Sequence, residues 1–587
     1  MSQRISVALS GTPPTTLAIG STASLTAVVT NDSKNAGVTW SVTCGSAQCG
    51  SFAPASTASA AATTYTPPAA PPSPVTVTVT ATSVTDTTKT ATAIISITLG
   101  IPPNGTYVYH FSGEDPNGPV FVAGAFTVMS GAITGGEQDF SDPLNAYTNN
   151  LVASTSTLTV ASDGNIQIVL DTGNASIGVS GLETLRGTPV SSSRILISEF
   201  DAFASGSGSI DLQTGTAAPS GGYAFNLGGL DSSGVPLVIG GILNISGTSL
   251  SVANSVLDYN DGGAVGQALS FTSGSVTAPD SFGRLSFTLT PNTPNVLGFV
   301  LNGYIVGANR IQLVEALGDP LNGDLGGTAL GQGTNAGNFT TANVGNSTYV
   351  FTGTGADAPA AANVQIAAVF NLSSAGAVSG VIALNDLTNF GALAITAGNY
   401  IVDSTGRVTI SNVTPSLVTN VPFAFQLYLD GNGNALELGV DSSQASAGLA
   451  YLQTATTATF AGTYALAGQG FGVLTTTTIP LGWSAAGPAT VSSTSSAAFT
   501  GFTDYTVQTI QTVNNVQSIA GATPTSNVAL TGTENSSTGI LALAGLDAAS
   551  STTSNNYAYI PIDTSRVLAI ETDGVQLGLL QLEAITP

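Results

Sequence analysis

Apolar and polar residues alternate along most of the chain in short runs, which is the pattern of β-strands with one buried face. Arg194-Ile-Leu-Ile-Ser-Glu199 is one such run, and a turn and a second short run follow it. The same order of strand, turn and strand begins again at Arg310, Ala435 and Arg566. Each second run ends in glutamine, at Gln213, Gln332, Gln453 and Gln581. The pattern predicts the closing hairpin of a β domain that occurs four times.

Each repeat opens with a strand that contains a tyrosine. The four tyrosines are Tyr107, Tyr223, Tyr349 and Tyr464, and the steps between them are 116, 126 and 115 residues. These steps are too long for a solenoid repeat and fit whole domains in tandem. About eight strands with short connections follow in each repeat, so we expect an up-and-down barrel, with an open two-sheet sandwich as the alternative.

The repeats are expected at residues 105–215, 220–333, 346–455 and 460–587, behind a separate domain at residues 1–100. The fourth repeat diverges, because it lacks the strand start that Gly283-Arg284 and Gly406-Arg407 provide in the second and third. Terminal repeats are often atypical, since one face has no neighbour. The expected fold class is therefore all-β, with an N-terminal sandwich and four barrel-like or sandwich repeats.

Residues 1–100 hold several short alternating runs separated by turn signals, which favours a two-sheet sandwich. Val38-Thr-Trp-Ser-Val42, the two cysteines after it and the final run Thr76-Val-Thr-Val-Thr-Ala-Thr-Ser83 resemble a bacterial immunoglobulin-like domain of the group-two type. This resemblance implies a spacer or adhesive module of a secreted or surface protein.

Cys44 and Cys49 are the two cysteines of the chain. We expect a local disulfide between them, and two buried thiols are the alternative. A metal site would need further ligands, and the single histidine, His110, lies far along the chain. Because disulfides persist in oxidising compartments, the pair indicates an extracellular or outer-surface location.

The Gly-Thr-Tyr opening at Gly462 and the glycine-rich second strands are loosely similar to calycin or avidin-type barrels. As a whole, the chain resembles bacterial secreted or surface exoproteins in which such repeats follow an immunoglobulin-like domain, which implies an extracellular protein. The first residues, 1–7, lack the charged start and apolar core of a signal peptide. This start fits either an intracellular protein or a mature form that carries a new initiating Met, and the composition and the cysteine pair favour the second.

Charge excludes several classes of partner. Residues 1–100 carry three cations and two acids, whereas residues 101–587 carry six arginines, no lysine and 31 acids. Such a surface repels nucleic acid and anionic lipid. No apolar run reaches the roughly 18 residues that a membrane-spanning helix needs. The expected partners are other copies of the chain, other surface proteins or glycans.

Few residues indicate metal binding. Asp430-Gly-Asn432-Gly-Asn434 resembles the start of a calcium loop, but the loop's required Gly and final Glu are missing, so a hairpin turn is the first interpretation. Asp258 and Asp261 also lie in a predicted turn. Because acids so far outnumber bases, weak calcium binding at Asp258, Asp261, Asp430 and Asn432 remains the alternative, and no other cofactor is expected.

The remaining candidates are aromatic or basic. The opening tyrosines Tyr107, Tyr223, Tyr349 and Tyr464 are expected to pack at barrel ends, and a sugar-binding rim is the alternative. Arg194, Arg310 and Arg566 are expected to be solvated or to lock a barrel end by bonding carbonyl groups, and reading a ligand is the alternative. His110 has no positioned nucleophile, and no pair of acids is marked for glycoside cleavage. We therefore expect no catalytic residues.

The leading hypothesis is an extracellular, non-enzymatic structural or adhesive protein, such as a surface stalk, matrix or filament subunit. It predicts filled domain interiors and an apolar or strand-edge surface for association. The alternative is a tandem binding module in which each barrel holds a small apolar ligand or glycan. That alternative predicts interiors lined by small residues, with an open mouth rimmed by aromatic side chains.

Overall fold

The computed structural model describes residues 4–586 except 20, 46–47, 69–71, 73–75, 99, 162–163, 317, 358–361, 388–389, 417–421, 456–460, 473–478, 493–497, 515, 536–539, 547–553 and 575. The described residues form strands, turns and three short 3-10 helices, which confirms the all-β class. Within this part of the chain, no helix is long and apolar enough to cross a membrane.

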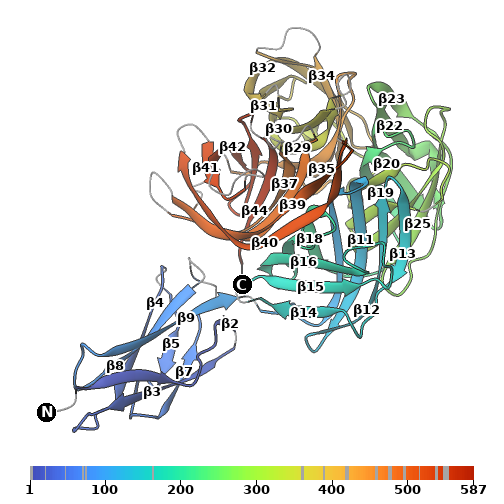
Figure 1. Ribbon diagram of the computed structural model, residues 1–587. Helices are drawn as coiled ribbons and strands as arrows, with labels where there is room; N and C mark the ends of the chain where they lie inside the picture. Colours follow the sequence, from blue (N-terminus) through green and yellow to red (C-terminus); the bar gives the residue numbers. More distant parts are fainter. Residues whose placement is uncertain are drawn as a thin grey trace.

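The N-terminal domain is a sandwich of two sheets, drawn in blue in Figure 1. One sheet has the strand order β1-β3-β7-β5 and the other the order β2-β9-β8-β4-β6. The strands are β1 (Ser6–Ser10), β2 (Thr16–Ala18), β3 (Ala23–Thr30), β4 (Val38–Thr43), β5 (Ser51–Ala53), β6 (Ser56–Thr57), β7 (Ala62–Thr66), β8 (Thr76–Ser83) and β9 (Thr90–Thr98). Trp40 is buried between the sheets, and the expected disulfide joins Cys44 to Cys49.

The first two repeats are a curled sheet and a closed barrel. Barrel 1 has the order β13-β12-β11-β10-β18-β17-β16-β15-β14 and stays open between β13 and β14. Barrel 2 closes through pairing of β19 with β20 and β28, and its β22–β23 hairpin branches from β20. The strands of barrel 1 are β10 (Gly105–Asp115), β11 (Gly118–Met129), β12 (Ala132–Asp142), β13 (Asn145–Asn150), β14 (Thr157–Val160), β15 (Ile166–Asp171), β16 (Leu182–Ser191), β17 (Arg194–Glu199) and β18 (Ser205–Leu212). Those of barrel 2 are β19 (Gly221–Leu230), β20 (Pro236–Ser246), β21 (Ser249–Leu250), β22 (Val256–Asp261), β23 (Ala264–Leu269), β24 (Phe271–Val276), β25 (Arg284–Pro291), β26 (Phe299–Gly307), β27 (Arg310–Glu315) and β28 (Asp324–Gly331).

The third and fourth repeats are closed eight-stranded barrels with consecutive strands paired. Barrel 3 contains β29 (Ser347–Asp357), β30 (Ala362–Leu372), β31 (Val378–Asn385), β32 (Phe390–Val402), β33 (Arg407–Pro415), β34 (Phe423–Leu429), β35 (Asn434–Gly439) and β36 (Gln444–Leu452). Barrel 4 contains β37 (Gly462–Gly472), β38 (Leu481–Val491), β39 (Ala498–Val513), β40 (Val516–Asn535), β41 (Ile540–Ala544), β42 (Ser554–Pro561), β43 (Arg566–Glu571) and β44 (Gln576–Ala584). Closure removes the free strand edges that an open sheet would expose.

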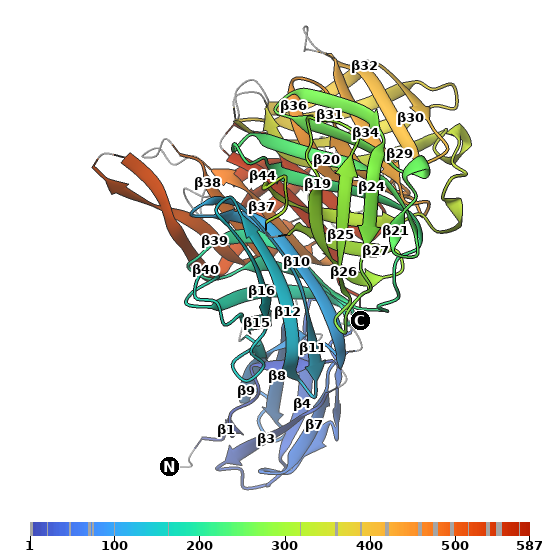
Figure 2. The ribbon, with the colours of Figure 1, turned by 90° about the vertical axis from the view of Figure 1, so that its right-hand side faces the viewer.

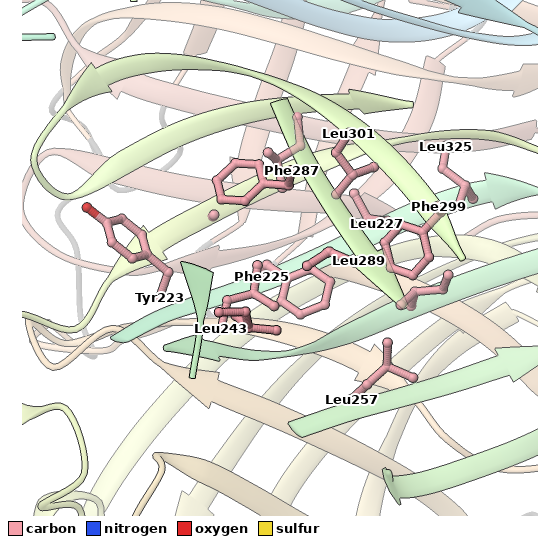
Figure 3. Close-up of a cluster of buried hydrophobic side chains, with 14 of the residues drawn as sticks. Tyr223, Phe225, Leu227, Leu243, Leu257, Phe287, Leu289, Phe299, Leu301 and Leu325 are labelled. Carbon is pink, nitrogen blue, oxygen red and sulfur yellow. The ribbon is translucent and has the colours of Figure 1, made fainter. Parts of the chain in front are cut away.

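Side chains fill the interior of each barrel. Inward-facing apolar residues form one buried cluster per barrel, and Figure 3 shows part of the cluster in barrel 2, with Phe225, Leu289 and Phe299 converging from different strands. Eight-stranded barrels are just wide enough for side chains to fill them. These interiors are therefore packed cores, and cavities have to be sought between the barrels.

The four barrels are arranged in chain order around a common centre. Barrel 1 lies lowest in Figure 1, barrel 2 on the right, barrel 3 at the top and barrel 4 on the left, and Figure 2 shows the same group from the side. Each barrel contacts the next one, and barrel 4 contacts barrel 1 through β37 and β38 packed on β17 and β18. The repeats thus form a closed ring instead of a row.

A recurrent backbone hydrogen bond marks the junctions and shows that the ring closes. Thr214, just after barrel 1, donates its N–H to Val306 O of barrel 2 at 2.8 Å, and Thr454 after barrel 3 donates to Ile562 O of barrel 4 at 2.8 Å. Thr586 after barrel 4 donates to Val190 O of barrel 1 at 2.7 Å. The junction between barrels 4 and 1 therefore repeats the backbone bond found after barrels 1 and 3, although no chain connection spans it.

The glutamines that end the repeats explain part of this geometry. Gln213 Nε2 donates to Ile305 O of barrel 2, Gln332 Nε2 to Leu429 O of barrel 3, and Gln453 Nε2 to Pro561 O of barrel 4, at 2.6–2.8 Å. The fourth predicted copy is different. Gln581 pairs with Ala467 inside barrel 4, and the residue that precedes the junction threonine there is Ile585. The prediction that Gln581 is equivalent to the other three glutamines is therefore wrong. The equivalent position is Ile585, four residues later.

Candidate functional site

Buried aspartates lie at three of the four junctions. Asp258 of barrel 2 is fully buried and accepts hydrogen bonds from Arg407 Nε and Nη2 at 2.7 Å and from Tyr428 Oη at 2.8 Å, all in barrel 3. Asp139 of barrel 1 accepts the equivalent bonds from Arg284 Nε at 2.6 Å and Tyr304 Oη at 2.7 Å in barrel 2. Charge-assisted, bidentate pairs of this kind fix orientation as well as distance.

The junction between barrels 4 and 1 uses the same device with one change. Asp504 accepts from Arg186 Nη1 at 3.0 Å and from Asn165 Nδ2 at 2.7 Å. The junction between barrels 3 and 4 replaces the ion pair by apolar contact, since Ala383 stands at the register position of Asp258 and packs with Ala367 and Ile570. Three junctions are therefore ionic at their centre and one is apolar.

A second set of charged residues lies where the closing hairpins of the four barrels meet. Strand pairing places Arg194 opposite Asp211, Arg310 opposite Leu330, Asn434 opposite Tyr451 and Arg566 opposite Glu583, so these four pairs are equivalent. Arg194 Nε lies 3.0 Å from Glu583 Oε2, and Arg310 Nη1 lies 3.7 Å from Asp211 Oδ2. The Arg566 guanidinium lies 4.8 Å from the centre of the Tyr451 ring. Each arginine thus contacts the preceding barrel of the ring.

The predicted solvated role of Arg194, Arg310 and Arg566 is consequently not what the structure shows. All six arginines of residues 101–587 contact a neighbouring barrel, because Arg186, Arg284 and Arg407 hold the junction aspartates. Although burial acts against it, the cations of Arg194 and Arg310 hold the pKa of Asp211 below its usual range. The few cations of this acidic ring thus stabilise the contacts between its barrels.

The four opening strands β10, β19, β29 and β37 surround a cavity of about 510 Å³ on the axis of the ring. All four barrels contribute to its wall. Outward-facing residues of the opening strands line it at equivalent positions, with Ser112, Gly228, Thr354 and Gln469 in one layer and Glu114, Leu230, Ala356 and Phe471 in the next. We call this space the axial cavity.

The axial cavity is largely apolar, with a few polar groups. Phe121, Phe471 and Val238 give it apolar surface, and Asn226, Arg310 and Gln365 give it hydrogen-bonding groups. Its volume falls within the roughly 300–1,000 Å³ of sites that bind small molecules. A mostly apolar wall with a small number of placed polar groups is also the usual composition of such sites.

Two ionisable side chains in the wall are shifted toward their neutral forms. Burial, aided by Asp115 and Asp324, raises the pKa of Glu114 to about 8. Burial and the cation of Arg310 lower the pKa of His110 to about 3. At neutral pH the wall therefore presents a largely protonated carboxyl and an uncharged imidazole. Among the described residues of the wall, Glu114 supplies the carboxyl, and no second one faces it as glycoside cleavage would require.

The predicted ligand-binding tyrosines lie elsewhere. Tyr107, Tyr223, Tyr349 and Tyr464 belong to the four interior clusters and do not line the axial cavity. Tyr107 Oη donates to Pro103 O at 2.9 Å and Tyr223 Oη to Ala308 O at 2.8 Å, which is the end-packing role that was the first interpretation. An inward-facing position explains both their recurrence and their distance from the axis.

The predicted metal ligands are not brought together. Asp258 is held by Arg407, and Asp430 accepts from the backbone N–H groups of Asn432 and Asn434 as a turn cap. Asp261 ends β22 at the turn of the branching hairpin. Within the described ranges, no group of three or more His, Cys, Asp or Glu side chains is placed to hold a metal ion.

Asn226, Gln365, Arg310 and Glu114 were not singled out from the sequence as a set. Only the arginine had been marked, and the others lie one per strand on three different barrels. A usable signal was present in the strands themselves, because runs such as Leu237-Val-Ile-Gly-Gly-Ile-Leu243 are apolar at consecutive positions, as strands buried on both faces are.

No protein-family model matches the chain, and no match is found among curated proteins.

Proposed function

We propose that this protein is an extracellular, non-enzymatic adhesive or structural protein, in which the ring of barrels is a rigid head and the N-terminal sandwich, proposed to be immunoglobulin-like, is its spacer. The observation that carries this proposal is that the inward-facing side chains and the arginines of the repeats both stabilise the ring itself. The barrel interiors are packed with side chains, and the arginines of the repeats contact a neighbouring barrel. A body built in this way is suited to present a fixed surface.

The filled interiors weaken the alternative of one small ligand inside each barrel. That alternative needs interiors lined by small residues, whereas Phe225, Phe351 and Trp483 occupy them here. Side chains of this size leave little room for a ligand in an eight-stranded barrel. Binding, where it contributes to adhesion, is better assigned to the surface of the ring or to the axial cavity.

The test uses the full chain. Light scattering and negative-stain imaging, with and without calcium, measure self-association, and beads coated with the chain measure retention on a surface that carries glycans. Ordered oligomers or retained beads support a structural or adhesive role. A monodisperse monomer whose beads are not retained contradicts it, and so does catalytic release of a product from the immobilised glycan.

A further inference from the structure

We propose that the axial cavity is a binding site for a neutral carbohydrate of one or two sugar units. The proposal deepens the adhesive function above and rests on it in one respect, because the sugar is held and not converted. It starts from hydrogen-bonding groups that the protein itself leaves unused at the place where the four barrels meet.

Two amide oxygens in the cavity wall require a hydrogen-bond donor. Gln365 is only 1% exposed, its Nε2 donates to Gln469 O at 3.4 Å, and its Oε1 has no partner among the described residues. Asn226 Nδ2 is fixed by two carbonyls of barrel 3, Glu437 O at 3.1 Å and Gly448 O at 2.8 Å. These bonds use both hydrogens of the amide, and no described group is found donating to Asn226 Oδ1. The buried Gln365 oxygen has no donor, which is costly, so a ligand whose hydroxyl group this amide can turn to meet is favoured.

The same wall also offers donors. Arg310 is 28% exposed, its Nη1 lies 3.7 Å from Asp211 Oδ2, and its Nε and Nη2 lie 3.0 and 3.1 Å from the amide of Gln312, which leaves part of the guanidinium to donate to a ligand. The hydroxyl-bearing Thr354 also lies in the wall, and Glu114 is largely protonated at neutral pH because its pKa is raised to about 8. A ligand that both donates and accepts at several points fits this mixture.

Hydroxyl groups on a ring with apolar C–H faces meet both requirements. The faces would lie against Phe121, Phe471 and Val238, and the hydroxyls would reach the amides and the guanidinium. An anion is disfavoured, because it would leave the two amide oxygens without donors, and Arg310, the cation among the described residues of the wall, already faces the Asp211 carboxylate. A purely apolar ligand would leave the amide oxygens unpaired. Neutral sugars are therefore the class that leaves the fewest groups without partners.

The experiment is saturation-transfer NMR followed by calorimetric titration of the full chain with glucose, galactose, mannose, N-acetylglucosamine, lactose and cellobiose at millimolar concentrations. Two variants locate the site. Gly228→Leu adds a side chain to the wall at a glycine with ordinary φ, where an added Cβ meets only Ala447 at 3.4 Å and Val238 at 3.9 Å. Gln365→Leu keeps the volume and removes the unpaired amide oxygen. Gly215→Leu is the matched control, because an added Cβ there has nothing within 4 Å and the residue is outside the cavity.

The expected result is saturable binding of at least one sugar by the parent chain and by Gly215→Leu, with loss of binding in Gly228→Leu. Binding by Gln365→Leu should weaken about tenfold, since one hydrogen bond to the ligand is removed. The proposal is overturned if no sugar binds saturably, or if both cavity variants bind as the parent does while their unfolding midpoints are unchanged. Consumption of a bound sugar would instead contradict the non-enzymatic function and leave the binding site in place.

Discussion

Replacing Arg407 by Met is expected to destabilise the ring by about 3 kcal/mol, because it leaves a buried carboxylate without its cation at the junction between barrels 2 and 3. Asp258 is fully buried and loses its two contacts with the guanidinium. Removing one partner of a buried ion pair costs about 3–5 kcal/mol. The lower end applies here, since Asp258 keeps the Tyr428 hydroxyl at 2.8 Å and the Ala268 N–H at 2.7 Å.

The double variant Asp258→Ala with Arg407→Met tests the reason for that loss. It contains no stranded charge, and the junction between barrels 3 and 4 already uses alanine at the same position, Ala383. It does leave the Tyr428 hydroxyl and the Ala268 N–H without their acceptor, which costs about 1–2 kcal/mol. The double variant should therefore be more stable than Arg407→Met alone by about 1–2 kcal/mol, and adding Tyr428→Phe should recover part of the remainder, since the Ala268 N–H stays unpaired.

Urea unfolding followed by tryptophan fluorescence separates the two parts of the molecule. The chain has two tryptophans, with Trp40 buried in the sandwich and Trp483 buried in barrel 4. If the barrels unfold as one ring, Arg407→Met lowers the midpoint of the Trp483 transition although the change lies in barrel 3. The Trp40 transition should stay where it is. Arg566→Met is the control, because Arg566 is 33% exposed, and its pair with Asp563 and its contact with the Tyr451 ring each contribute less than about 1 kcal/mol.

Two results would refute this reasoning. Equal destabilisation in the single and double variants would mean that the stranded Asp258 carboxylate is not the source of the loss. An unmoved Trp483 transition would mean that the barrels unfold independently, and the closed ring would then lack the mechanical coupling that its junctions imply.

Three further predictions follow from the same contacts. Burial raises the pKa of Glu437 to about 8, so between about pH 4.5 and pH 8 the folded chain holds a proton that the unfolded chain has lost. The stability of the folded chain should therefore fall as the pH rises through this range. Thermal melts of Glu437→Gln across the same range should show a smaller fall. Thr586→Pro removes the N–H that closes the ring and should cost about 1 kcal/mol in urea unfolding, whereas Thr586→Val, which keeps it, should cost less. Reducing the Cys44–Cys49 disulfide should lower the Trp40 transition by about 2 kcal/mol and leave Trp483 unaffected, and a shift of both would contradict the separation of sandwich and ring.

Strand alternation and the spacing of the opening tyrosines were sufficient to predict an all-β chain with tandem barrels, because inward-facing residues obey a local rule. The ring was not predictable in the same way. Asp139, Asp258 and Asp504 are outward-facing acids that look like solvated residues in a sequence. Their partners in the neighbouring barrel lie between 145 and 339 residues away, counted along the chain. Only the packing of one barrel on the next reveals that they are buried.

The axial cavity shows the same limit more sharply. Its wall takes one or a few residues from strands in every barrel, and no two of the decisive groups are neighbours in sequence. Taken one at a time in the sequence, His110 is expected in the core or at a barrel rim, and Arg310 in solvent or bonded to carbonyl groups. Neither residue alone predicts a shared site. A site formed by the outer faces of four domains leaves no local motif, since each contributing strand also has to satisfy its own barrel.

The layers around the axis have a consequence for how this body can recognise anything at its centre. In an assembly of four identical subunits, every residue on the axis would occur four times, and a charged one would repel its own copies. Here the four copies belong to one polypeptide and have diverged, so that Ser112, Gly228, Thr354 and Gln469 share a single layer. The axis of this single chain therefore lacks fourfold symmetry, and the junctions keep it only in part, since the one between barrels 3 and 4 is apolar. An asymmetric centre of this kind can hold an asymmetric molecule in one orientation, which a strictly fourfold pore cannot do.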